Sequence, residues 1–114
     1  MIETLATLQL AAYNRADLDA FCACFHADVT VLAADGGVRT RGMAAFREAY
    51  AGLFGGFRDV SATVDARVGL GPHLVERERW SRVDRHTGAR SGGEVLVRYT
   101  EGDGLIRWVQ FLAP

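Results

Sequence analysis

An almost continuous alternation of apolar and polar residues in the second half of the chain limits the fold more than any other feature. From Arg58 onward, this period of two extends over about residues 59–70, 74–83, 94–100 and 105–112. The turn sequences GP, RHTG and EGDG separate these segments. Alternating segments joined by short turns predict antiparallel β-strands. We therefore expect the C-terminal half to form one sheet of long strands.

The first half of the chain has the helical period instead. Apolar residues recur at helical spacing over residues 2–13, 17–25 and 43–54, which predicts three amphipathic helices. Asn14 tolerates the left-handed backbone that ends a helix, and Asp17 is a good N-cap for the next one. A tight bend between the first two helices is therefore expected.

A short hairpin is predicted between the second and third helices. Its strands, residues 29–34 and 38–41, flank the turn sequence DGG. We expect an α+β fold, in which a strongly curved, cone-shaped antiparallel sheet of about six strands carries three helices on its concave side. The 114 residues suffice for one hydrophobic core, so residues 1–114 are expected to form a single domain.

Composition argues against several classes of partner and cofactor. The formal net charge of -1 leaves no basic excess to attract nucleic acid or anionic membranes. No signal sequence is recognisable, and no apolar run approaches the roughly 18 residues of a membrane-spanning helix, so a cytoplasmic protein is expected. The histidines lack the spacing of a zinc site, and we expect no metal and no cofactor. Cys22 and Cys24 are expected to be buried and reduced.

Strict alternation assigns the inward faces of two strands. In strand 59–70, every second residue from Val60 to Leu70 is expected to face the core, with Asp65 and Arg67 outward. In strand 105–112, the inward residues are expected to be Ile106, Trp108, Gln110 and Leu112. The outward residues of that strand would be Arg107, Val109 and Phe111.

The inward face of strand 74–83 depends on charge pairing. Placing Asp65 opposite Arg77 or Arg79 is favourable across a ladder, whereas the intermediate register sets it opposite Glu78. Either favourable register turns three side chains inward: Glu76, Glu78 and Trp80. Inward carboxylates require a partly wet interior or a partner, because an unpaired buried charge costs several kcal/mol. The open alternative is that both glutamates are solvated surface residues.

These faces predict a pocket between the helices and the sheet. Its expected ligand-binding residues are Gln9, Tyr13, Val31, Trp80, Val95, Tyr99, Trp108 and Gln110. Glu78 or Glu76 is the candidate general base, since an apolar wall raises the pKa of a carboxyl group toward neutrality. Gln9 or Tyr99 is the candidate donor to an oxyanion formed during the reaction.

Three stretches of the chain resemble the nuclear transport factor 2-like superfamily, in particular its SnoaL-like and steroid Δ-isomerase-like branch. They are YNRADLDAFCACFHADVTV, RTRGMAAFREAYAGLF and VRYTEGDGLIRWVQFL, and the resemblance extends over nearly the whole chain. It implies a cone-shaped pocket between helices and a curved sheet, often in a homodimer joined through the outer faces of the sheets. Here that outer face is expected to carry Leu96, Val109 and Phe111.

The chain departs from the catalytic pattern that the resemblance implies. An ungapped match places the tyrosine of the steroid isomerases at Gln9, their aspartate base at Ala33 and their oxyanion-binding aspartic acid at Val95. The acid/base aspartate of SnoaL-type cyclases also falls on Val95. The same match would turn Arg77 and Arg79 inward, against the charge pairing. Neither Ala33 nor Val95 can move a proton, so steroid isomerisation by the usual residues is not expected.

Two functional hypotheses remain from the sequence. In the first, a dimer binds a small, partly apolar molecule in the pocket and acts as a SnoaL-like or isomerase-like enzyme with a different acid/base set. In the second, the chain is a non-catalytic dimeric binding or interaction module. Inward Glu and Gln residues favour the first, because a pocket without a ligand would more easily fill with Leu and Phe.

Overall fold

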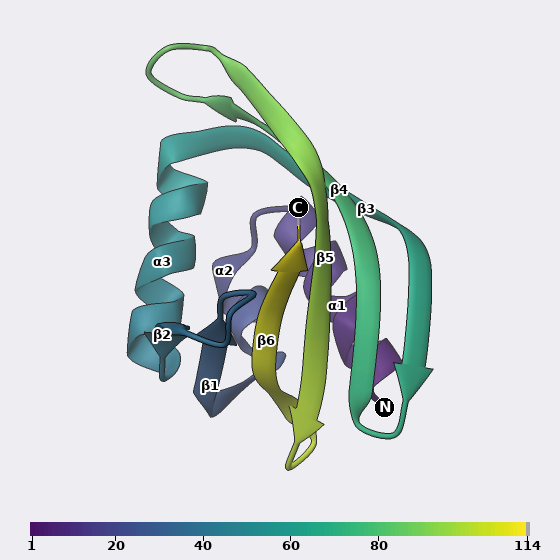
Figure 1. The fold of residues 1–114 in the computed structure, drawn as a ribbon. Coiled ribbons are helices and arrows are strands. Elements are labelled where there is room, and N and C mark those ends of the chain that lie inside the picture. Colours follow the sequence, from purple (N-terminus) through teal and green to yellow (C-terminus); the bar gives the residue numbers. More distant parts are fainter. Residues whose placement is uncertain (114) are drawn as a thin grey trace.

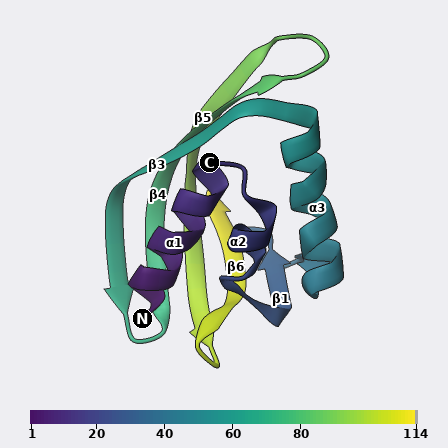
Figure 2. The same ribbon diagram turned by 180° about the vertical axis from the view of Figure 1, so that it is seen from behind.

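The computed structural model describes residues 1–113, in which three helices lie against a six-stranded sheet. In Figure 1 the sheet curves strongly, and in Figure 2 α1 and α2 lie across one of its faces while α3 stands beside β1. The expected α+β fold with a cone-shaped sheet is confirmed. The elements in chain order are α1 (Ile2–Asn14), α2 (Leu18–Cys22), β1 (Phe25–Leu32), β2 (Val38–Arg41), α3 (Met43–Gly56), β3 (Phe57–Leu70), β4 (His73–Asp84), β5 (Arg90–Gly102) and β6 (Leu105–Ala113).

The order of strands in the sheet is β2-β1-β6-β5-β4-β3. Four of the five ladders are antiparallel, as expected, but β1 pairs with β6 in parallel. The sheet is therefore mixed. Phe25 of β1 lies opposite Ile106 of β6, so both strands start at the same end of the sheet. None of the helices in residues 1–113 has the length and apolar character needed to cross a bilayer.

The bend after α1 is built differently from the expectation. Ala16, not Asn14, adopts the left-handed backbone, with a φ of 52°. The Asn14 side chain instead reaches β3, where Nδ2 donates to the carbonyl of Ala62 (3.0 Å) and Oδ1 accepts from its N–H (2.7 Å). Asp17 caps α2 as predicted, because its Oδ1 accepts from the backbone N–H of Ala20 (3.1 Å).

Helix α2 ends earlier than its sequence pattern indicated. It stops at Cys22 rather than at Phe25, and β1 begins at Phe25 instead of Val29. The ring of Phe25 packs between Phe21 and Phe46, with centroids 4.9 and 4.5 Å away, and an extended backbone presents it to both. Tertiary packing thus overrides the helical period here. Both cysteines are free and buried, as predicted.

A β-bulge in β3 reverses the face assignment beyond Val64. Val64 pairs with Glu78 while Ala66 pairs with Arg77, so Asp65 is an extra residue on β3. Alternation therefore shifts by one position. The expectation that Ala66, Val68 and Leu70 face inward is wrong, because all three are exposed, Val68 at 73% and Leu70 at 83%. Arg67, which was expected outside, turns inward.

A second bulge has the same effect on β6. Ile106 pairs with Glu101 and Trp108 with the adjacent Thr100, which leaves Arg107 as the extra residue. Ile106 is buried as expected, but the next inward residues are Val109 and Phe111. The expectations for Trp108, Gln110 and Leu112 are therefore wrong, since these side chains point to the outer face. Val109 and Phe111 in turn do not belong to that face.

Candidate functional site

A cavity of ≈ 330 Å³ lies between the helices and the inner face of the sheet. Its walls come from α1, α2 and α3 on one side and from β2 to β6 on the other. The volume is within the range of small-molecule sites. The lining residues are Gln9, Leu10, Tyr13, Phe21, Arg39, Tyr50, Leu53, Ala62, Glu78, Trp80, Arg82, Val95, Tyr99 and Phe111.

The cavity brings together six of the ten residues predicted from the sequence. They are Gln9, Tyr13, Glu78, Trp80, Val95 and Tyr99. Val31 is buried in the hydrophobic core without reaching the cavity, and Glu76 lies on the same face of β4 but outside it. The bulge in β6 turns Trp108 and Gln110 to the outer face of the sheet, away from the cavity. On the outer face, Gln110 accepts from Arg98 (2.8 Å) and donates to the carbonyl of Ala33 (3.1 Å).

Glu78 is the acidic side chain of the cavity wall, and it is only 9% exposed. The Tyr99 hydroxyl donates to Glu78 Oε2 (3.4 Å), and Gln9 Nε2 donates to the Tyr99 oxygen (3.3 Å). Gln9 Nε2 also donates to the carbonyl of Ala6 (3.1 Å). Both amide hydrogens of Gln9 are thus engaged within the protein. Its role in this arrangement is to orient Tyr99, and it is not free to bind an oxyanion.

Burial raises the pKa of Glu78 to about 7, and the charge of nearby Glu76 contributes to the rise. The hydrogen bond from Tyr99 acts in the opposite direction. Burial also raises the pKa of the Tyr99 hydroxyl well above its usual value, so it stays protonated. A carboxyl group with a pKa near neutrality can both accept and return a proton.

Glu76 has a structural ion pair instead of a place in the cavity. Its Oε2 lies 2.5 Å from Arg67 Nη2 and accepts from Arg67 Nε (2.7 Å). The bulge at Asp65 makes this pair, because it turns Arg67 inward. Burial raises the pKa of Glu76, and attraction to Arg67 offsets part of the rise. The pair removes Glu76 as a candidate base and leaves Glu78.

Two tyrosine hydroxyls of the cavity wall have no hydrogen-bond partner among residues 1–113. They belong to Tyr13 of α1 and Tyr50 of α3. Burial raises the pKa of both hydroxyls, so they remain donors near neutral pH. In the sequence, Tyr50 recurs at helical spacing with Phe46 and Leu53 on the apolar face of segment 43–54, a pattern that indicates core packing as much as a ligand contact. Tyr50 was therefore missed as a site residue.

Two arginines also line the cavity and were not predicted. Arg82 lies two residues after Trp80 on β4, and its guanidinium carbon lies over the Trp80 and Phe57 rings, 4.8 and 4.2 Å from their centroids. Arg39 of β2 lies over Phe111, 5.6 Å from its centroid. Continued alternation beyond Trp80 was the signal for Arg82. Arg39 had no such signal, because its strand is short.

A family model for the SnoaL-like domain matches residues 6–109. The chain belongs to the SnoaL-like family. No curated protein matches its sequence. The predicted membership of the nuclear transport factor 2-like superfamily is therefore confirmed by the family match and by the fold.

Solved structures with this SnoaL-like fold include three that overlay most of the chain. An uncharacterised cystatin-fold protein from Novosphingobium aromaticivorans has a TM-score of 0.85 at 22% identity, covering 95% of this chain and 94% of that one. TerC, co-crystallised with polyporic acid, has a TM-score of 0.80 at 14% identity, with coverages of 97% and 89%. A protein with a ketosteroid isomerase-like fold from Catenulispora acidiphila, in complex with trimethylamine, has a TM-score of 0.79 at 17% identity, with coverages of 94% and 82%.

In this SnoaL-like chain, the carboxyl group of Glu78 lies near the position where the resemblance implies a catalytic aspartate. That position is Val95 of β5, which lies directly opposite Glu78 on the neighbouring strand β4. Side chains of directly opposed residues share a face of the sheet. Glu78 on β4 thus presents its carboxyl group to the same cavity as Val95 on the neighbouring strand β5.

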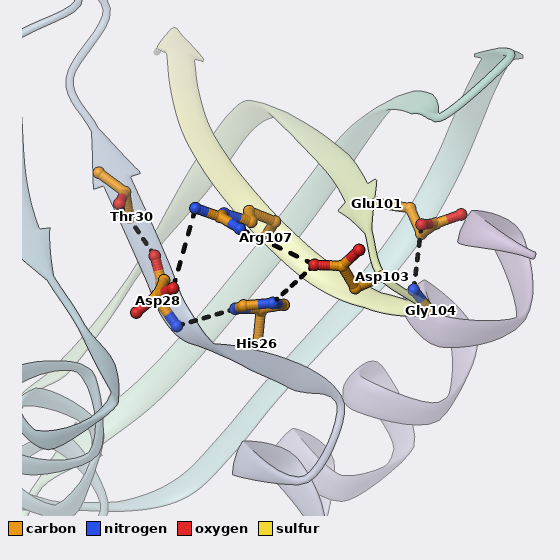
Figure 3. A network of polar contacts seen from close by, with 7 residues as sticks. All are labelled: His26, Asp28, Thr30, Glu101, Asp103, Gly104 and Arg107. Carbon is orange, nitrogen blue, oxygen red and sulfur yellow. Dashed lines mark hydrogen bonds and ion pairs between the residues drawn. The ribbon is translucent and has the colours of Figure 1, made fainter.

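A second polar cluster of the SnoaL-like domain lies outside the cavity (Figure 3). His26 Nε2 is 3.2 Å from Asp103 Oδ2, and His26 Nδ1 accepts from the backbone N–H of Asp28 (2.9 Å). The Arg107 guanidinium lies 3.9 Å from the Asp28 carboxylate and 4.0 Å from the Asp103 carboxylate. These contacts connect the start of β1 to the β5–β6 turn. Within residues 1–113, no group of three His, Cys, Asp or Glu side chains is arranged to hold a metal ion.

Proposed function

We propose that this SnoaL-like protein binds a small, partly apolar molecule in the cavity and catalyses proton transfer on it, with Glu78 as general base. The observation that carries the proposal is the buried Glu78 carboxyl group, which lines an aromatic cavity and has a pKa raised to about 7. General bases work best when their pKa lies near the operating pH.

The cavity supplies the other parts of such a reaction. The Glu78 carboxylate would take a proton from a carbon next to a carbonyl group, while Tyr99 holds the carboxylate in place. The electron pair of the broken C–H bond would move onto the carbonyl oxygen, where the free hydroxyls of Tyr13 and Tyr50 would donate to it. Glu78 would then return the proton to the far carbon of a conjugated double bond. Alternatively, the enolate would attack a second carbonyl group, and the alkoxide formed would take the proton from Glu78.

Structural relatives support the choice of ligand size. TerC was crystallised with polyporic acid, and the protein from Catenulispora acidiphila was crystallised with trimethylamine. Both are small organic molecules that were crystallised with proteins of this fold. Together with the ≈ 330 Å³ cavity, they favour a compact organic ligand over a polymer.

Deuterium exchange on 2-tetralone, a neutral ring ketone with acidic C–H bonds, tests the proposal. In deuterated buffer, the protein should accelerate exchange at the carbons next to the carbonyl, as measured by NMR. The rate should rise with pH through about 7, because the ionised form of Glu78 is the base. Binding without exchange would favour the non-catalytic module, and absence of binding would reject the proposed site.

The outer face of the sheet supports a further part of the proposal, a homodimer. Exposed apolar side chains on this face are Val68, Leu96, Trp108 and Leu112, and such groups at a sheet surface are typical of interfaces. Light scattering at micromolar concentration should therefore give about twice the 12.4 kDa monomer mass. Trp108→Glu should shift the mass to that of a monomer, whereas Leu8→Glu, exposed on α1, should not. A monomeric wild-type protein would contradict the proposal.

A further inference from the structure

The two arginines of the cavity have no carboxylate partner within 4.0 Å among residues 1–113. Some other arginines of the sheet have such a partner: Arg67 pairs with Glu76, and Arg77 pairs with Asp65 at 2.7 Å. Arg39 and Arg82 line the cavity without such a partner, and neither is paired with Glu78. A positive charge in a partly enclosed space attracts an anion more strongly than one in open water. The cavity therefore has unbalanced positive charge beside its aromatic walls.

Aromatic rings lie against both guanidinium groups. The Arg82 guanidinium lies over the Trp80 and Phe57 rings, and the Arg39 guanidinium lies over Phe111. Such contacts use the faces of the guanidinium groups and leave N–H groups at their edges for hydrogen bonds. Arg82 Nε is buried without a hydrogen-bond partner among the described residues, so an anion would reach this guanidinium through its two Nη groups. A guanidinium that lies against aromatic rings and has no carboxylate partner is well suited to binding a carboxylate through two parallel hydrogen bonds.

The different burial of the two arginines and Glu78 indicates how an acidic ligand would be oriented in the cavity. Arg39 is exposed and Arg82 half-buried, whereas Glu78 is buried, so the arginines lie toward the open side of the cavity. An acidic group would be repelled by ionised Glu78 but attracted by the arginines. The rest of such a ligand would lie along the rings toward Glu78.

Accepting the proposed function, we infer that the ligand is an organic acid with an apolar ring body, whose anionic group binds Arg39 and Arg82. The ring body contacts the aromatic wall and reaches the Glu78 end of the cavity. The two arginines thus determine specificity for anionic over neutral molecules of the same shape.

Two ligands of equal shape test this inference by isothermal titration calorimetry: 2-naphthoate, which is an anion, and 2-naphthamide, which is neutral. Wild-type protein should bind the naphthoate at least about tenfold more tightly, as expected for hydrogen bonds to a charged group. Arg82→Gln and Arg39→Gln should each reduce this preference several-fold and leave naphthamide affinity unchanged. Arg41→Gln and Arg79→Gln remove the same charge from exposed positions outside the cavity and should preserve it.

The outcomes separate this inference from the proposed function. Equal binding of both compounds would overturn the inference but leave the cavity as a ligand site. A naphthoate preference that persists in both cavity variants, or that is lost in Arg41→Gln, would place the anion elsewhere and overturn it as well. If neither compound binds, the proposed cavity function fails and the inference fails with it. Unchanged naphthamide affinity shows that each variant remains folded.

Discussion

Glu78→Gln is expected to reduce the rate of protein-catalysed proton exchange on 2-tetralone roughly 10²- to 10⁴-fold, the usual loss when a positioned general base is removed. Glutamine keeps the shape and the contact with Tyr99 but cannot accept a proton at neutral pH. NMR measurement of deuterium uptake at pH 8 tests this. The matched control is Glu94→Gln, which removes a carboxylate from an exposed position outside the cavity. A variant that keeps more than about a tenth of the wild-type rate would exclude Glu78 as the base.

The stability of the same variant shows that lost exchange is not caused by unfolding. The pKa of Glu78 is raised from 4.5 to about 7 in the folded protein, so the native state holds this proton more tightly than the unfolded state. Its contribution to stability is complete below about pH 4.5 and is lost as the pH rises to about 7. Relative to wild type, Glu78→Gln should thus gain about 3 kcal/mol in unfolding free energy between pH 4 and pH 8, as measured by urea denaturation.

Phe21→Ala is expected to lower the free energy of unfolding by about 3 to 5 kcal/mol, the range for a fully buried aromatic residue. Phe21 is 1% exposed and lies at the centre of the aromatic cluster. Its ring centroid is 4.6 Å from that of Tyr50, 4.9 Å from that of Phe25 and 5.8 Å from that of Phe46. Helix α2 has only five residues and cannot be stable alone, so this packing holds it in place.

Urea denaturation with fluorescence detection measures the effect of Phe21→Ala. Leu8→Ala is the control, because Leu8 is 55% exposed on α1 and its truncation should cost less than about 0.5 kcal/mol. A loss below about 1.5 kcal/mol for Phe21→Ala would mean that the cluster collapses into the space. That result would contradict its role as the anchor of α2.

The fold was predictable from the sequence because it depends on the periods of whole segments, which an error of one residue in the register of a strand does not change. Alternation after Arg58 and the helical period before it define the layers whether or not a single strand slips. The positions of Glu76, Glu78 and Trp80 were also predictable, since β4 carries no extra residue where these side chains lie. The predicted charge pair of Asp65 with Arg77 is present (2.7 Å). Asp65 forms it as the extra residue of a bulge and not as a regular partner in the ladder.

The remaining site residues depended on bulges that alternation does not reveal. One extra residue at Arg107 placed Trp108 and Gln110 on the outer face and Phe111 in the cavity. Nothing in the sequence near Arg107 is specific for a bulge, because neither glycine nor an unusual residue is required there. Arg39 and Tyr50 reach the cavity through the packing of β2 and α3, which is a tertiary property. Helix and strand periods cannot predict such contacts.

The strand order also has a consequence for how the chain folds. Hairpins join β3 to β4, β4 to β5 and β5 to β6 through short turns, but the ladder between β1 and β6 joins Phe25 to Ile106, about 80 residues later. Contacts of such long sequence separation slow folding, because loop-closure entropy opposes them. We expect the amides of β1 to become protected together with β6 or after it, and pulsed hydrogen exchange during refolding would measure this order. The cavity has walls from both halves of the chain, so it would be the last part of the molecule to take shape.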